Sequence, residues 1–178
     1  MKTEYEIRIL EIDKEEMIRK LEKLGAKKIV EFNQKRYVYN LKPAEEGKWI
    51  RLRTNGRITT LTYKDIVSNT IDGTKEIEIE VNDFETTNEF LEKIGFIHKR
   101  YEENNRIQYI LDGVEIDIDS WPMIPTYMEI EGASESEVLD KLELLEVNKF
   151  KVTTLNCGDI YTQIYGIDID KIEEIKFS

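Results

Sequence analysis

The chain has 178 residues, of which 40% are apolar and 35% are charged, and its formal net charge is −11. This composition excludes a disordered chain, and no apolar run is long enough for a helix that spans a membrane. The single cysteine, Cys157, excludes an internal disulfide, and the N-terminus shows no apolar signal segment. We therefore expect one cytoplasmic domain over residues 1–178, without a membrane partner.

The two halves of the chain differ in charge. Residues 1–75 hold 17 Lys and Arg against 12 Asp and Glu, whereas residues 76–178 hold 9 against 25. The acidic surplus argues against a nucleic-acid partner. A basic half beside an acidic half suits a bound polyphosphate with a divalent metal ion.

The sequence predicts eight strands and three clear helices, with several strands between one helix and the next. Strands are predicted at residues 3–10, 35–41, 49–54, 58–64, 75–82, 106–111, 114–119 and 127–132. Helices are expected after the N-caps Asp13, Thr86 and Ser134, with the first two ending at Gly25 and Gly95. A fourth, less regular helix is expected near residues 157–165. Asn55-Gly56 and Asp112-Gly113 predict two-residue hairpin turns.

The sequence of the first half recurs in the second. Residues 21–25, LEKLG, return as LEKIG at residues 91–95, and the KRY of residues 35–37 returns at residues 99–101. Each half then contains a strand, a helix and three strands. Four strands alone bury little surface, so we expect an internal duplication that forms one closed structure.

The polar positions of the strands carry rows of like charges. Glu4, Glu6 and Arg8 alternate with apolar residues, as do the rows Arg51/Arg53, Glu76/Glu78/Glu80, Glu115/Asp117/Asp119 and Glu129/Glu131. Residues i and i+2 share one face of a sheet, so each row presents its charges side by side. These faces either point to water or line the inside of a barrel whose helices cover the apolar outer surface. Like charges repel across an open sheet, which favours the barrel.

Charges inside a barrel require partners. Carboxylates with almost no His or Cys suit Mg²⁺ or Mn²⁺ rather than zinc. The basic residues Arg8, Arg51, Arg53 and Lys64 suit phosphate oxygens, which arginine can bind with two hydrogen bonds. The only histidine, His98, and the only cysteine, Cys157, are interpreted as structural residues, and no glycine-rich phosphate loop is present.

Glu4-x-Glu6-x-Arg8 resembles the ExExK signature that opens proteins of the CYTH superfamily, the triphosphate tunnel metalloenzymes. Arg51-x-Arg53, Lys64, Glu76-x-Glu78, Arg106, Asp119 and Glu129-x-Glu131 follow in the order of that family. The resemblance covers about residues 2–132. It implies an α+β fold: a closed, eight-stranded antiparallel β-barrel, or tunnel, with helices outside and a pseudo-twofold repeat.

The resemblance also implies roles for individual residues. Metal ligands would be Glu4, Glu6, Glu78, Asp119, Glu129 and Glu131, among which Glu6, Glu78 and Asp119 are the catalytic candidates. Arg8, Arg51, Arg53, Lys64 and Arg106 would bind the triphosphate. Glu76, Glu80 and Asp117 share the same faces.

Three positions depart from the family pattern. Arg8 replaces the signature lysine, and the basic Lys35-Arg36 replaces an acidic residue. Asn104 stands where the family often has a lysine, so one phosphate contact is lost unless Lys99 or Arg100 supplies it. These departures affect efficiency and substrate choice more than the fold.

The leading hypothesis is hydrolysis of a small-molecule triphosphate, inorganic or organic, that depends on Mg²⁺ or Mn²⁺. One ion would be held by Glu4, Glu6, Glu129 and Glu131, and a second, near Glu78 or Asp119, would activate water. The alternatives are a class IV adenylate cyclase, which converts ATP to cyclic AMP and pyrophosphate, and a non-catalytic polyphosphate- or nucleotide-binding protein. The sequence leaves open the metal, the substrate and whether the protein forms a homodimer.

Overall fold

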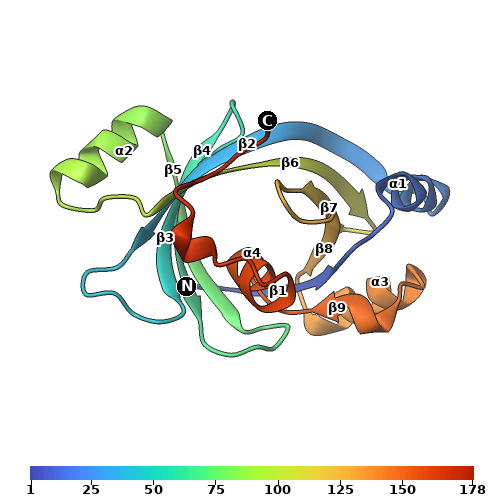
Figure 1. Ribbon diagram of the computed structural model, residues 1–178. Helices are drawn as coiled ribbons and strands as arrows, with labels where there is room; N and C mark the ends of the chain where they lie inside the picture. Colours follow the sequence, from blue (N-terminus) through green and yellow to red (C-terminus); the bar gives the residue numbers. More distant parts are fainter.

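A computed structural model describes all 178 residues, and its main feature is a closed barrel of eight antiparallel strands (Figure 1). The strands are β1 Lys2–Ile9, β2 Lys27–Asn40, β3 Lys48–Thr54, β4 Thr59–Ile66, β5 Thr74–Val81, β6 Arg100–Leu111, β7 Val114–Ser120 and β8 Tyr127–Gly132. They follow one another around the barrel in the order β6-β2-β3-β4-β5-β1-β8-β7, and pairing of β7 with β6 closes it. The predicted fold class is confirmed.

The helices are α1 Lys14–Lys23, α2 Phe84–Lys93, α3 Glu135–Leu144 and the short α4 Cys157–Asp159, which continues as the π-helical turn η2 Ile160–Ile164. Asp13 caps α1 as predicted, since its carboxylate accepts the Glu16 backbone N–H at 2.8 Å. The predicted cap of α2 is wrong. Asp83, rather than Thr86, caps this helix and accepts the Thr86 N–H at 2.7 Å. No helix is both long enough and apolar enough to cross a bilayer.

The two predicted hairpins have different turns. Asp112 and Gly113 form the expected two-residue turn, with φ of 49° and 86°, between the paired residues Leu111 and Val114. The turn at Asn55-Gly56 is longer than predicted, because Thr54 pairs with Thr59 and leaves four residues in the loop. The Asn55 side chain accepts the N–H groups of residues 57 and 58, which stabilises this wider turn.

β2 and β6 are much longer than the predicted strands at 35–41 and 106–111. They pair with each other from Lys27 opposite Ile110 to Val38 opposite Arg100. The added segments carry polar residues on both faces, including the run from Glu102 to Asn105. The alternation of apolar and polar residues that marks a half-buried strand is therefore absent from them.

The apolar faces of the strands point outward and form the hydrophobic core under the helices. Ile7, Ile116 and Ile130 are almost fully buried against Leu21 of α1 and Val138 of α3. A separate cluster joins Phe84 and Leu91 of α2 to Tyr39 and Leu52 on β2 and β3. This arrangement leaves the charged faces for the inside of the barrel, as the barrel interpretation predicts. The outer face of β5 is not covered, so Ile77 and Ile79 are 51% and 54% exposed.

The internal repeat is visible in how α1 and α2 end. Gly25 and Gly95 have φ of 84° and 96°, and the residue after each glycine donates its N–H to the carbonyl of Leu21 or Leu91. A glycine is favoured here because the left-handed conformation is strained for other residues. The matching LEKLG and LEKIG segments thus end equivalent helices, each preceded by one strand and followed by three, in the order that the predicted duplication requires.

The C-terminal segment returns to the barrel after α3. β9, Val152–Thr153, pairs with β1, and β10, Glu174–Ile175, pairs in parallel with β6. Between them lie α4, η2 and the 3-10 turn η3 Ile169–Lys171, and Figure 1 shows α4 in front of the barrel. The Tyr161 hydroxyl donates to the Pro122 carbonyl at 2.5 Å, which attaches this segment to the loop before β8.

Candidate functional site

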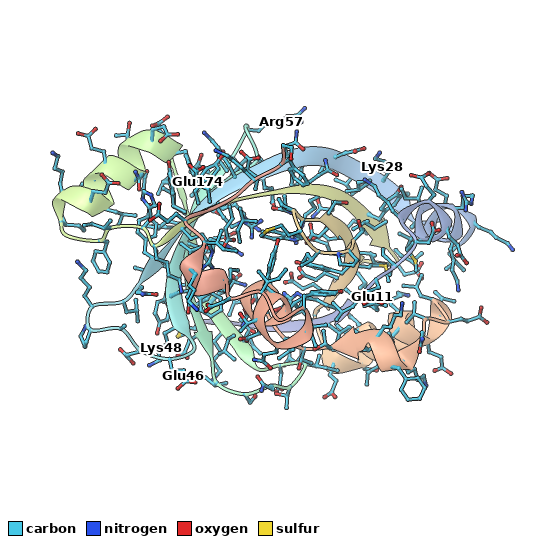
Figure 2. All side chains as sticks on the ribbon, viewed as in Figure 1. Glu11, Lys28, Glu46, Lys48, Arg57 and Glu174 are labelled. Atoms are coloured by element: carbon cyan, nitrogen blue, oxygen red, sulfur yellow. The ribbon has the colours of Figure 1, made fainter.

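The inside of the barrel is a cavity of about 1060 Å³ with a charged lining. Figure 2 shows side chains filling the barrel, whereas the labelled Arg57 and Lys28 lie at its periphery. Twelve residues of the predicted site and its charged rows line this cavity: Glu4, Glu6, Arg8, Arg51, Arg53, Lys64, Glu76, Glu78, Arg106, Glu115, Glu129 and Glu131. The structure thus gathers into one space charges that come from seven different strands.

Three residues of the charged rows do not line the cavity. Asp119 is completely buried, and Asp117 is 2% exposed, behind the lining residue Arg106. Glu80, near the end of β5, is exposed. Asp119 and Asp117 therefore act on the site through Arg106 in this arrangement.

Carboxylates from β1 and β8 form one side of the cavity, called here the acidic wall: Glu4, Glu6, Glu129 and Glu131. Glu6 lies opposite Glu131, and Arg8 lies opposite Glu129, in the register of the two strands. Side chains directly opposite each other on neighbouring strands have Cβ atoms about 5 Å apart. The register therefore brings acids from two distant parts of the sequence together.

Two arginines neutralise much of the acidic wall. Arg8 contacts Glu6 at 2.9 Å and Glu129 at 2.6 Å. Arg106 contacts Asp119 at 2.6 Å and Glu129 at 3.4 Å, and it also forms an ion pair with Asp117. Each guanidinium forms ion pairs with two or more carboxylates, so the charge of both arginines is already neutralised.

The pKa values on the acidic wall follow this pairing. Burial alone would raise the pKa of Glu129, but the charges of Arg8 and Arg106 outweigh burial and lower that pKa to about 2. Burial raises the pKa of Glu6, and repulsion from Glu129 adds to this effect, although Arg8 opposes it. Burial also raises the pKa of Glu4 and of Glu131. The wall therefore still favours an added cation.

The opposite side of the cavity, called here the basic wall, consists of Arg36 on β2 and of Arg51 and Arg53 on β3. Arg36 and Arg53 are direct neighbours across the two strands. The carboxylate nearest to Arg51 and Arg53 is that of Glu78, at 3.4 and 3.7 Å. Burial and the charges of Arg51 and Arg36 together lower the pKa of Arg53 to about 9. The basic wall thus has more positive charge than its own acids neutralise.

Lys64 on β4 lies between the two walls. Its ammonium group donates to both carboxylate oxygens of Glu4, at 2.8 and 2.6 Å, and lies 3.3 Å from Glu76. The residue is 7% exposed, so these contacts satisfy a buried cation. Lys64 therefore joins β4 to the carboxylates of β1 and β5.

Sequence reasoning missed a buried polar network that joins Arg36 of β2 to the added part of β6. Arg36, Arg100, Glu102 and Asn104 are each at most 7% exposed. Arg100 pairs with Glu102 at 2.7 Å, and Arg36 donates to Asn104. The KRY repeat at 35–37 and 99–101 was the available signal, since it places Arg36 and Arg100 at equivalent positions of the two halves.

The chemistry of the acidic wall fits a hard divalent cation. Glu4, Glu6, Glu129 and Glu131 offer oxygen ligands only, and Mg²⁺ and Mn²⁺ prefer such ligands. No three acidic, histidine or cysteine residues are arranged as a ready-made metal cluster. Glu6 and Glu129 instead contact Arg8, so metal binding would require them to exchange this partner for the ion.

The two residues interpreted as structural are not placed for catalysis. His98 packs against Tyr37, with 4.3 Å between ring centroids, and is absent from the cavity lining. Cys157 lines the cavity, but burial raises the pKa of its thiol to about 12, which leaves little thiolate at neutral pH. A nucleophilic cysteine is therefore not supported.

The sequence matches the model of the CYTH domain family over residues 2–155. A search of curated protein sequences finds no significant match. Among solved structures, a protein from Pyrococcus horikoshii OT3 is 24% identical with a TM-score of 0.76, and 86% of this chain and 96% of that chain are covered.

Two further solved structures are similar in fold. A candidate adenylate cyclase from Vibrio parahaemolyticus is 12% identical, has a TM-score of 0.77, and is covered over 98% of its length by 90% of this chain. A candidate adenylyl cyclase from Hippeastrum, with a dominant triphosphatase activity, is 15% identical and has a TM-score of 0.64, with 94% of this chain and 97% of that chain covered. At these identities the likeness concerns the fold.

Proposed function

The chain belongs to the CYTH domain family, and from this premise we propose that it hydrolyses a small-molecule triphosphate in its barrel cavity with the help of Mg²⁺ or Mn²⁺. One observation carries the proposal. The basic wall, whose arginines have too few nearby carboxylates to neutralise them, faces the acidic wall across the same cavity. A phosphate chain would neutralise the first wall. The carboxylates of the second wall would hold a divalent cation, which would supply further charge neutralisation for the phosphates.

Arg51 and Arg53 would bind phosphate oxygens. Their side chains line the cavity and are 13% and 21% exposed, and the only acid that their guanidinium groups touch is Glu78. A planar guanidinium can bind two oxygens of one phosphate and so fix its orientation. Such positioning and charge neutralisation supply most of the catalysis in phosphoryl transfer.

Glu4, Glu6, Glu129 and Glu131 would hold the metal. When bound, a divalent ion would neutralise charge on the phosphate oxygens and lower the pKa of a coordinated water. Glu6 and Glu129 would release Arg8 as the ion binds, which frees that guanidinium to bind the substrate. Asp119 and Asp117 would keep Arg106 in place through their ion pairs with it.

The Hippeastrum protein combines the description of an adenylyl cyclase candidate with a dominant triphosphatase activity, so both products must be measured. The test is to incubate the purified protein with tripolyphosphate, thiamine triphosphate or ATP in Mg²⁺, in Mn²⁺ and in EDTA. We expect metal-dependent release of orthophosphate. Cyclic AMP and pyrophosphate from ATP would identify a cyclase instead. Tight binding without any turnover would identify a non-catalytic binding protein and overturn the proposal.

A further inference from the structure

Arg36 lies in the cavity at a point where three strands meet. It is on β2, opposite Arg53 of β3 on one side and opposite Glu102 of β6 on the other. The residue is only 7% exposed, and it belongs to the cavity lining. Its charge is therefore held next to the proposed phosphate-binding residue Arg53.

No carboxylate is committed to Arg36. The nearest acid is Glu102 at 4.0 Å, and Glu102 already pairs with Arg100 at 2.7 Å. The hydrogen-bond partners of Arg36 are the neutral amides of Gln34, at 3.0 Å, and Asn104, while its Nε has none. Burial lowers the pKa of Arg36 and the charge of Arg51 adds to this effect, although the Glu102 carboxylate opposes it. A buried cation of this kind is stabilised by an anion.

Neutral neighbours hold the guanidinium of Arg36 in a fixed position. Its Cζ lies 4.6 Å from the centroid of the Trp121 ring, a cation–π contact. Asn104, which is completely buried, accepts from Arg36 and donates to Asp119 at 3.0 Å. A basic residue at position 104 would repel Arg36, whereas the amide of asparagine orients it without adding charge.

We propose that Arg36 is an additional phosphate-binding residue, adjacent to Arg53, and that Asn104 is its positioning residue. This inference rests on the proposed function and identifies which residue replaces the basic side chain absent at position 104. Lys99 and Arg100, the two replacements suggested by the sequence, are exposed or already paired. Arg100 binds Glu102 and the Ile169 carbonyl, and Lys99 is exposed and contacts Asp170.

The test measures binding of tripolyphosphate by calorimetry in EDTA, so that metal ligation does not contribute. We expect Arg36→Gln to weaken binding roughly 10- to 100-fold, the effect of losing a charged hydrogen-bond donor. Arg36→Lys, which keeps the charge but loses the planar fork, should fall between Arg36→Gln and the wild type. Arg57→Gln is the matched control, because Arg57 is exposed on the β3–β4 turn and outside the cavity lining (Figure 2). Its affinity should stay within about twofold of the wild type.

The positioning role of Asn104 is tested by a double-mutant cycle. Asn104→Ala should weaken binding several-fold in the wild-type background and leave the affinity of Arg36→Gln unchanged. Equal affinity of the wild type, Arg36→Gln and Arg36→Lys would overturn this inference and leave the proposed function standing. Additive losses would overturn the positioning role of Asn104. A wild type that does not bind tripolyphosphate would overturn the inference and the proposed function together.

Discussion

The two walls of the cavity treat their charges in opposite ways. On the acidic wall, Arg8 is shared by Glu6 and Glu129, so the wall is largely neutralised from within. On the basic wall, Arg51 and Arg53 share one acid, Glu78, and the hydrogen-bond partners of Arg36 are neutral amides. The basic wall is therefore ready for an anion as it stands, whereas the acidic wall must rearrange before it can bind a cation.

The largest expected effect is on turnover. Glu6→Gln removes a carboxylate that the acidic wall needs for a metal, so we expect loss of triphosphate hydrolysis by at least about 100-fold. Metal-free binding of tripolyphosphate should persist, because the basic wall is intact. Glu22→Gln, on the exposed face of α1, is the matched control and should retain full activity. An active Glu6→Gln variant would refute the metal assignment.

The second prediction compares one arginine from each wall by stability. Arg8→Gln leaves the buried Glu6 and Glu129 without a shared partner, so we expect the free energy of unfolding to fall by roughly 3 kcal/mol. Arg53→Gln removes a positive charge from a crowded cluster and should leave stability unchanged or higher. Urea denaturation of both variants measures the difference. Equal losses would contradict the prediction, because they would mean that both walls are equally neutralised.

The third prediction concerns pH. Glu129 has a pKa of about 2 in the folded protein, below the ordinary value of 4.5, so its stabilising effect is present above pH 4.5 and lost as pH falls through 2. The contribution is roughly 3 kcal/mol from a shift of this size. Stability of the wild type relative to Glu129→Gln should therefore decline between pH 4.5 and 2. Parallel curves for the two proteins over this range would show that Arg8 and Arg106 do not hold Glu129 in its charged form.

The smallest expected effect is at the edge of the acidic wall. Lys2 contacts Glu131 at 3.0 Å, but its side chain is 65% exposed. Exposed ion pairs contribute little, so Lys2→Gln should change the free energy of unfolding by less than about 1 kcal/mol. A loss as large as that of Arg8→Gln would mean that neutralisation of the wall does not depend on its buried arginines.

The charged rows could be predicted because alternation in a strand is a local pattern. Glu4 and Glu6, Arg51 and Arg53, and Glu129 and Glu131 each lie two residues apart, and this spacing alone places each pair on one face. The inward orientation followed from the apolar residues between them, which need the cover of the helices. The order of the rows then supported the family resemblance.

The pairing of these charges could not be predicted in the same way. Whether Arg8 faces Glu129 depends on the register of β1 and β8, which lie far apart in the sequence. Arg36 and Asn104 were not identified as a pair because Asn104 lies in a stretch of β6 that is polar on both faces, where the strand pattern is weak. The departures at positions 36 and 104 were visible from the sequence, but only the structure brings them into contact.

The C-terminal segment holds two of the buried arginines through its backbone. The carbonyl of Leu155 accepts from Arg8 at 3.0 Å, and that of Ile169 accepts from Arg100 at 3.3 Å. Every residue type offers the same carbonyl oxygen, so substitutions at positions 155 and 169 can preserve both hydrogen bonds if the chain keeps its path. These two hydrogen bonds therefore constrain the length and path of the segment rather than its side chains, since a change in length would shift the oxygens away from the arginines.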